Sequence, residues 1–300
     1  MKVKIMKLTK RTSQIILRGF LFSLIFFFCV NIFSETWQES SVTFRTVESV
    51  RPVWQSFANG VGYFHGKTTQ TQLEFWALMI DLKAPDTRIV TRTGNTNAGG
   101  NLSMRVSSFV RDNNLAAGIN AVPFDIVTAQ EGQPVKNMGI VISEGRTLSG
   151  ANPYYDAIIF YEDGAAAICR QTEISSIENI ENAIGGFHQI LADGQPAQRT
   201  LNSADRHPRS AAGVSANGRY LYLLVIDGRR SDSIGATEGE TATLLRNLGC
   251  ASGINFDGGG SSALALRYPD GSVKTANQPV HNGFPGRERA VAGCLGIALR

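Results

Sequence analysis

Toward its end the chain reads Gly253-Ile254-Asn255-Phe256-Asp257-Gly258-Gly259-Gly260-Ser261-Ser262-Ala263-Leu264-Ala265-Leu266. A short apolar run ends in a carboxylate, three glycines and two hydroxyls follow, and a second apolar run begins. Because ordered glycines cost conformational entropy, Gly258–Gly260 predicts a turn with φ > 0 or a close backbone approach. Such a turn can form an anion-binding concavity, to which Asp257, Ser261 and Ser262 add a carboxylate and two hydroxyls. The alternative is a tight hairpin whose aspartate hydrogen-bonds its own turn.

The first 34 residues have the pattern of a targeting segment. Six Lys and Arg residues precede an apolar run over residues 19–30, which is short for a transmembrane helix. We expect a signal peptide over residues 1–34 and an exported protein, periplasmic or secreted, with an uncleaved membrane anchor as the alternative. We further expect an N-terminal extension with strands over 35–74 and the main domain over 75–300.

The basic charge of the chain belongs to this leader. The sequence holds 29 Lys and Arg against 25 Asp and Glu, and removal of residues 1–34 leaves 23 against 25, a formal charge of −2. This balance gives no argument for nucleic-acid binding. Cys169, Cys250 and Cys294 lack metal-ligand spacing, so we expect no metal site. One disulfide with a buried thiol, or three buried thiols, would both be consistent with the sequence.

Strand patterns outnumber helical ones along the chain. Residues 73–82 predict a buried strand, 116–120 a strand that ends in Asn120, and 210–226 a hairpin around Asn217-Gly218. Apolar residues from Leu102 to Val110 fall on one helical face. We predict an α+β fold, a single domain with a mixed, mostly antiparallel sheet and a few packed helices.

The best-defined helix precedes the glycine turn. Thr237 and Glu240 have the spacing of a capping box, an apolar stripe follows, and Gly249 marks the stop. Glu240 therefore has two candidate roles, as a helix cap and as a catalytic carboxylate. The two are compatible, because a helix N-terminus also favours an anion nearby.

Polar clusters stand where predicted strands end or begin. Besides Asn120 and the glycine turn, they are Asp227-Gly228-Arg229 and Arg206-His207-Pro208-Arg209-Ser210. Rigid strands that deliver functional groups onto loops commonly build binding and catalytic sites. These clusters therefore make up the candidate site.

The order of these clusters resembles the phosphodiester glycosidase family, whose members include the enzyme that uncovers mannose 6-phosphate by removing α-linked N-acetylglucosamine. The resemblance runs from about Phe75 to Arg300. The matching pieces are Pro208–Gly213, Val225–Arg229, Gly235–Glu240, Asn255–Ser262 and Glu288–Val291. Asn120 departs from the family pattern, because Ala121-Val122-Pro123 follows it here where the family usually has two glycines and aromatic residues.

The resemblance implies hydrolysis of a sugar 1-phosphodiester, and the residue types suit that chemistry. The phosphodiester anion leaves readily, so a catalytic acid is less needed than in ordinary glycosidases. A suitable site holds one ionised carboxylate, guanidinium or backbone N–H donors for the phosphate, and polar groups for the sugar. No organic cofactor is expected.

The candidate catalytic residues are Asp257 or Glu240, to activate water or attack the anomeric carbon, and Asp227, whose alternative role is to stabilise its turn. The candidate binding residues are Asn120, Arg209, Arg229, Gly258, Gly259, Gly260, Ser261, Ser262 and Arg289. Arg209 and Arg229 would clamp the phosphate or form surface salt bridges. Arg289 would anchor the site or cover the sheet edge, and His207 is expected to be a solvated loop residue.

Three functions compete at this point. The first is an exported phosphodiester glycosidase acting on a sugar-phosphate or cell-envelope glycan, with N-acetylglucosamine as the model sugar. The second is a non-catalytic glycan- or phosphate-binding domain, which the residues after Asn120 favour. The third is a phosphodiesterase that cleaves P–O, which would normally need metal ligands that the sequence does not show.

Overall fold

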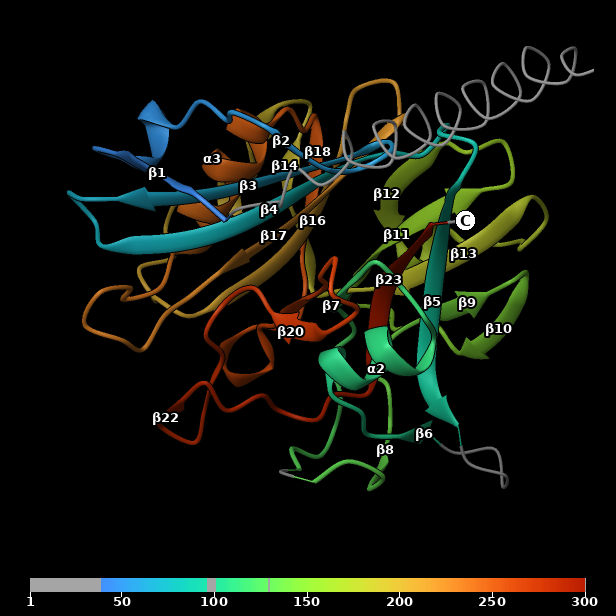
Figure 1. The fold of residues 1–300 in the computed structure, drawn as a ribbon. Coiled ribbons are helices and arrows are strands. Elements are labelled where there is room, and N and C mark those ends of the chain that lie inside the picture. Colours follow the sequence, from blue (N-terminus) through green and yellow to red (C-terminus); the bar gives the residue numbers. More distant parts are fainter. Residues whose placement is uncertain (1–38, 96–100, 129, 300) are drawn as a thin grey trace, which may run out of the picture. The chain divides into compact units, whose positions relative to one another are not determined.

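The apolar run predicted as a buried strand forms β4 (Leu73–Asp81), in the middle of a nine-stranded sheet. The structure is a computed structural model that describes residues 39–95, 101–128 and 130–299 (Figure 1). The expected signal peptide over residues 1–34 lies outside these ranges. β4 pairs antiparallel with β17 (Tyr220–Ile226), and β17 pairs with β16 (Arg209–Val214), which confirms the predicted hairpin.

The strand order of this sheet is β1-β3-β4-β17-β16-β18-β14-β15, with β2 paired to β3. Every pair is antiparallel except β1 with β3. The remaining strands are β1 (Ser41–Phe44), β2 (Gln55–Ala58), β3 (Val61–Thr68), β14 (His188–Ala192), β15 (Gln195–Pro196) and β18 (Ser252–Asn255). The strands expected over residues 35–74 thus belong to the same sheet as later parts of the chain.

A second, seven-stranded sheet has the order β20-β19-β7-β23-β5-β6-β8 and is antiparallel throughout. Its last strand in sequence, β23, lies between β5 and β7 (Figure 1). The strands are β5 (Thr87–Asn95), β6 (Asn101–Leu102), β7 (Ala117–Asn120), β8 (Pro134–Val135), β19 (Leu264–Arg267), β20 (Val273–Thr275) and β23 (Gly293–Leu299).

A five-stranded antiparallel sheet, in the order β10-β9-β13-β11-β12, and one hairpin complete the strands. The sheet consists of β9 (Val141–Ser143), β10 (Arg146–Ser149), β11 (Asp156–Tyr161), β12 (Ala166–Arg170) and β13 (Ile180–Gly185). The hairpin consists of β21 (Val280–His281) and β22 (Phe284–Pro285). Short 3₁₀ turns are η1 (Val47–Ser49), η2 (Gln171–Glu173), η3 (Gln198–Thr200) and η4 (Gly259–Ser261).

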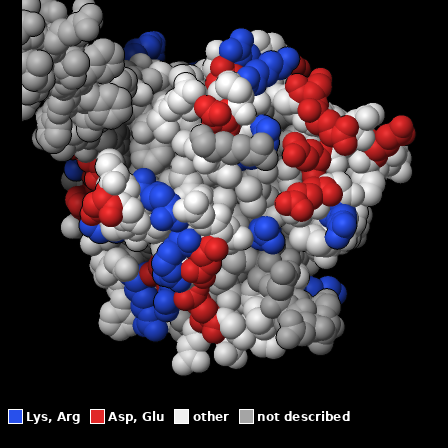
Figure 2. Space-filling model, turned by 45° about the vertical axis from the view of Figure 1, so that its right-hand side comes forward, with Lys and Arg blue, Asp and Glu red and all other residues white. Residues whose placement is uncertain are grey.

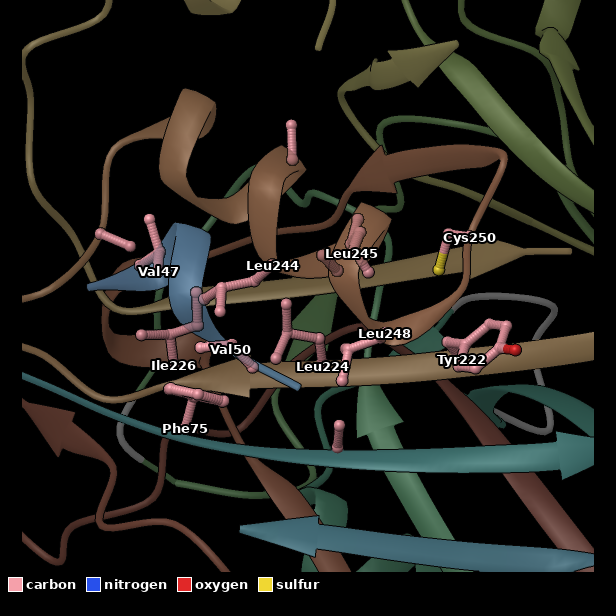
Figure 3. Packing of buried hydrophobic residues seen from close by; sticks show 14 of the residues in the cluster. Val47, Val50, Phe75, Tyr222, Leu224, Ile226, Leu244, Leu245, Leu248 and Cys250 are labelled. Carbon is pink, nitrogen blue, oxygen red and sulfur yellow. The ribbon is translucent and has the colours of Figure 1, made fainter. Parts of the chain in front are cut away.

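The helix predicted before the glycine turn is α3 (Glu238–Leu248), and its capping box is confirmed. The Thr237 hydroxyl accepts from Glu240 N, while Glu240 Oε2 accepts from Thr237 N at 2.9 Å. The helix ends at Gly249, whose φ of 120° favours glycine. Leu244, Leu245 and Leu248 lie against the nine-stranded sheet (Figure 3) and are buried there.

The other described helix is shorter than its apolar face suggests. α2 covers only Val106–Asp112, because Leu102 already pairs in β6. Phe109 and Val110 are buried against the second sheet. With only α2 and α3 in the described part of the chain, the fold is dominated by mostly antiparallel sheets, and the α+β description overstates its helical content.

Candidate functional site

The predicted polar clusters meet at one end of the nine-stranded sheet. Because β17, β16, β18 and β14 are antiparallel neighbours, β17 and β18 end where β16 and β14 begin. Arg229, Arg209 and the glycine turn therefore share this end of the sheet. From the second sheet, the end of β7 brings Asn120, whose Nδ2 donates to Asp257 O at 2.6 Å.

The three glycines of the turn allow close approach, as predicted. Gly259 has a φ of +62°, and its N–H donates to Pro208 O at 2.8 Å. A Cβ atom on Gly259 would lie 2.9 Å from Nη2 of Arg229, and one on Gly260 would lie 2.5 Å from Nη2 of Arg289. Side chains at these positions would displace two guanidinium groups, so the glycines bring both cations onto the turn.

The carboxylate of Asp257 lies near one of these cations, Arg289. It accepts hydrogen bonds from the Ser261 side chain and from Gly258 N–H, and it is attracted by the charge of Arg289. Burial nevertheless raises the pKa of Asp257 to about 6, because it penalises the charged form more than these contacts favour it. The group is ionised at neutral pH and has a pKa suited to accepting a proton there.

Arg289 is held by neutral groups. Its Nε donates to Nδ1 of His281 at 3.2 Å, and its Nη1 donates to Ser261 Oγ at 3.1 Å. Burial, together with the charges of Arg289, Arg287 and Arg229, lowers the pKa of His281, so the imidazole is neutral and its Nδ1 can accept the hydrogen bond from Arg289. In the described ranges no carboxylate lies within salt-bridge distance of Arg289 or Arg229. Two cations that form no salt bridge are suited to bind an anion.

His281 was missed by the sequence analysis. It lies in β21, is 1% exposed, and its Nε2 has no hydrogen-bond partner among the described residues. No motif surrounds it, and its link to the site depends on a contact with Arg289 eight residues away. Only the three-dimensional structure shows this residue to be part of the site.

Asn120 braces the turn. Its Oδ1 accepts from Ser210 Oγ at 2.7 Å and from Ala263 N at 3.1 Å, while its Nδ2 donates to Asp257 O. The carboxamide is fully buried and ties strands from both sheets to the catalytic candidate. The binding role predicted for Asn120 stays a prediction, but its contacts are those of a support.

Asp227 is also engaged with the protein itself. Its carboxylate accepts from Asn277 Nδ2 at 2.9 Å, from Gln278 N at 3.0 Å and from Arg230 Nη1. Burial raises its pKa to about 6. These bonds fix the segment that leads to His281. Ser262 lies nearby, 1% exposed, with an Oγ that has no partner among the described residues.

Glu240 and Arg209 hold the start of α3. Both Glu240 oxygens accept from Arg206, each at 2.8 Å, in addition to capping the helix. Arg209 is 7% exposed, and it donates from Nε to Ala236 O at 3.0 Å and from Nη2 to Asp205 O at 3.1 Å. Their predicted roles in catalysis and phosphate binding stay predictions. His207 is exposed, as expected for a loop residue.

The residues after Asn120 fold inward. Ala121 and Val122 are buried, and Ala121 O accepts from Asp257 N at 2.9 Å. Pro123, which lacks an N–H, uses its carbonyl to accept from Met138 N at 2.7 Å. The departure from the family pattern therefore still supports the Asp257 backbone.

One hollow on the surface is less suited to an anion. A surface hollow is lined by Glu144, Glu162 and Glu181 with Arg88. On the side of the molecule that Figure 2 brings forward, acidic side chains gather in several groups, and groups of Lys and Arg lie among them. Such a hollow repels anionic ligands.

Within the described ranges, no three or more His, Cys, Asp or Glu side chains are grouped to hold a metal ion. In the same ranges, no helix is long and apolar enough to cross a membrane. Cys169, Cys250 and Cys294 are free thiols.

Comparisons with known proteins extend these observations. A family model described as phosphodiester glycosidase matches residues 113–298. The SPbeta prophage-derived uncharacterized protein YomE of Bacillus subtilis is 27% identical over 151 residues, which are 48% of this chain and only 22% of that protein.

Two solved structures share the fold. The catalytic domain of zebrafish N-acetylglucosamine-1-phosphodiester alpha-N-acetylglucosaminidase, described as auto-inhibited by its pro-peptide, has a TM-score of 0.62 at 22% identity, over 85% of this chain and 87% of that chain. A hypothetical protein from Synechocystis has a TM-score of 0.60 at 16% identity, over 80% of this chain and 62% of that chain.

Proposed function

We propose that this chain, which belongs to the phosphodiester glycosidase family, hydrolyses the glycosidic C–O bond of a sugar 1-phosphodiester. The observation that carries the proposal is the pairing of one carboxylate with two cations on a single turn. Asp257 lies beside Arg289, and Arg229 approaches Gly259 of the same turn. Among the described residues neither guanidinium group forms a salt bridge, and only Arg289 is attracted by a nearby carboxylate, that of Asp257, so both retain N–H donors for a phosphate.

The arrangement supports a simple division of roles. Arg229 and Arg289 bind the phosphodiester oxygens and stabilise the negative charge that develops as the C–O bond breaks. The electron pair of that bond leaves with the phosphate oxygen, so no acid is required. Asp257 either takes a proton from the attacking water or attacks the anomeric carbon itself, and water then releases the sugar. The first route inverts the anomeric configuration and the second retains it.

The test is hydrolysis of a benzyl phosphodiester of α-N-acetylglucosamine 1-phosphate in ¹⁸O-labelled water. Cleavage of C–O leaves the benzyl phosphate unlabelled, whereas cleavage of P–O places the label in the phosphate and would support a phosphodiesterase. The phosphate is the readout because the C1 hydroxyl of a free sugar exchanges its oxygen with water. An Asp257→Asn variant is the negative control, and a parallel reaction with chelator tests for a metal requirement. Phosphate binding without any product would support a binding domain and contradict the proposal.

We also propose that the protein acts outside the cytoplasm on a sugar-phosphate polymer or another cell-envelope glycan. The support is the Lys/Arg-rich start followed by the apolar run over residues 19–30. Mass spectrometry of the protein from its native host should find residues 1 to about 34 removed. An intact N-terminus would favour membrane anchoring through that segment.

A further inference from the structure

Beside the candidate catalytic residue lie three buried polar atoms without hydrogen-bond partners among the described residues. They are Nδ1 of His188, Oδ1 of Asn255 and Oδ1 of Asp156. The last of these lies 3.8 Å from Nη1 of Arg170, which is an ion pair but not a hydrogen bond. Unpaired buried polar atoms are uncommon, and leaving each one unsatisfied costs about 1–3 kcal/mol. Three such atoms close together suggest that a bound ligand supplies their hydrogen-bond partners.

The backbone brings these three side chains together. His188 and Asn255 are direct partners in the antiparallel pair β14–β18, so their side chains point to the same face of the sheet. Asp156 is tied to this pair because its Oδ2 accepts from Gln189 N at 2.6 Å. Asp156 and Asn255 offer acceptors, and a neutral histidine offers one donor and one acceptor.

Aromatic rings lie next to these polar atoms. Tyr155 contacts Phe187 edge-to-face with ring centroids 5.2 Å apart, and it contacts His188 at 5.8 Å. All three rings are only partly buried, so each leaves part of its surface to solvent. Apolar ring surface combined with a few fixed polar groups is the usual composition of a small-molecule site.

The place of this cluster in the sheet links it to the site at the glycine turn. Along the sheet end the order is β17, β16, β18 and β14, with neighbouring strands about 4.8 Å apart. Arg229 follows β17, Asp257 follows β18, and His188 begins β14. Asp257 therefore lies between Arg229 and His188 along this end of the sheet. The strand that it follows, β18, is the direct neighbour of β14, which begins at His188.

We propose that Tyr155, Phe187, His188 and Asn255 form the subsite for the sugar ring of the substrate. This inference rests on the proposed function, because it assigns the uncharged half of a sugar 1-phosphodiester to one side of Asp257 and the phosphate to the other. Sugar hydroxyls both donate and accept, so they satisfy the buried oxygens and the imidazole nitrogen. The C–H face of a sugar ring matches the exposed aromatic surface. Burial lowers the pKa of His188, which keeps the imidazole neutral and suited to an uncharged ligand.

The experiment measures binding of the sugar half and of the phosphate half of the substrate separately, in the absence of hydrolysis. Binding of free N-acetylglucosamine, glucose, mannose and galactose is followed by saturation-transfer NMR, and binding of inorganic phosphate by calorimetry, both on Asp257→Asn protein. His188→Phe keeps the ring volume and removes both nitrogens, and Tyr155→Ala removes ring surface from a partly exposed position. His207→Phe is the matched control, because His207 is an exposed histidine near Arg209 and Arg229 and away from Tyr155 and Phe187. A melting curve accompanies each variant.

At least one sugar should bind, and its dissociation constant should rise at least about tenfold in His188→Phe and Tyr155→Ala while phosphate binding changes less than about twofold. Equal sugar affinity in these folded variants, or no bound sugar at millimolar concentrations, would overturn the subsite. The outcome is separable from the proposed function. Labelled-water hydrolysis that is unchanged by His188→Phe leaves the function standing without the subsite. Sugar binding that depends on His188 in a protein without hydrolytic activity leaves the subsite standing without the function.

Discussion

Replacement of Asp257 by asparagine should remove activity and change the pH dependence of stability in a defined direction. Burial raises the pKa of this carboxyl from 3.8 to about 6. The folded state therefore holds the proton more tightly than the unfolded state, and the contribution of Asp257 to the free energy of unfolding falls as pH rises through this interval. At about 1.4 kcal/mol for each pKa unit, the ionised carboxylate costs about 3 kcal/mol of stability at neutral pH.

Asparagine removes that cost but keeps only one acceptor for the Ser261 and Gly258 contacts, a loss of about 1 kcal/mol. We expect Asp257→Asn to be about 2 kcal/mol more stable than the wild type at about pH 8 and about 1 kcal/mol less stable at about pH 3.5. Urea denaturation at both pH values measures the difference in free energy of unfolding between the variant and the wild type. The contributions of the other titrating groups cancel in this difference, because both proteins contain them.

The same variant should hydrolyse sugar phosphodiesters at least about a hundredfold more slowly, because general-base assistance is typically worth about 10²–10⁴ in rate. Wild-type turnover should fall below about pH 6 as Asp257 becomes protonated. A stability difference that does not change with pH would refute the assignment of this pKa to Asp257. Retention of activity would move the catalytic role to another carboxylate.

Three further substitutions separate binding from support. Arg229→Gln should weaken phosphate binding about tenfold, measured by calorimetry, with an unchanged melting temperature, because the guanidinium makes no hydrogen bond or ion pair with the described residues. Gly260→Ala should weaken phosphate binding by a similar factor, since its Cβ would displace Arg289; equal affinity would show that the arginine is not a ligand. Arg209→Lys should lower the free energy of unfolding by about 1–2 kcal/mol in urea and leave phosphate affinity within twofold, because its bonds run to Ala236 O and Asp205 O; the opposite pattern would restore Arg209 as a phosphate ligand.

Local chemistry made several elements predictable from the sequence. The capping box of Thr237 and Glu240 joins residues three apart, and in the Asn217-Gly218 turn the Asn217 side chain accepts from Arg219 N, two residues away. The close approach at Gly258–Gly260 could be inferred because glycine is the residue that permits it. The first two predictions depend on interactions within a few residues along the chain, and the third depends on the properties of glycine itself, although the groups that approach it, Arg229 and Arg289, are distant in sequence.

The roles of individual side chains could not be inferred in the same way. Asn120 reaches Asp257 across 137 residues, and Asp227 reaches Asn277 across 50. Whether a polar residue at a strand end faces a ligand or supports the backbone depends on such distant partners. The contribution of His281 is invisible in sequence for the same reason.

The position of β23 has a consequence for how the protein is made. Because this strand lies between β5 and β7, residues 87–95 and 117–120 are not joined in one sheet until residues 293–299 are available to pair with both. On the ribosome, the second sheet cannot close before nearly the whole described chain has been synthesised. During that time β5 and β7 expose unpaired edges, which can pair with other chains. The last strand in sequence therefore closes the second sheet, and loss of these few residues would leave both neighbours unpaired along one side.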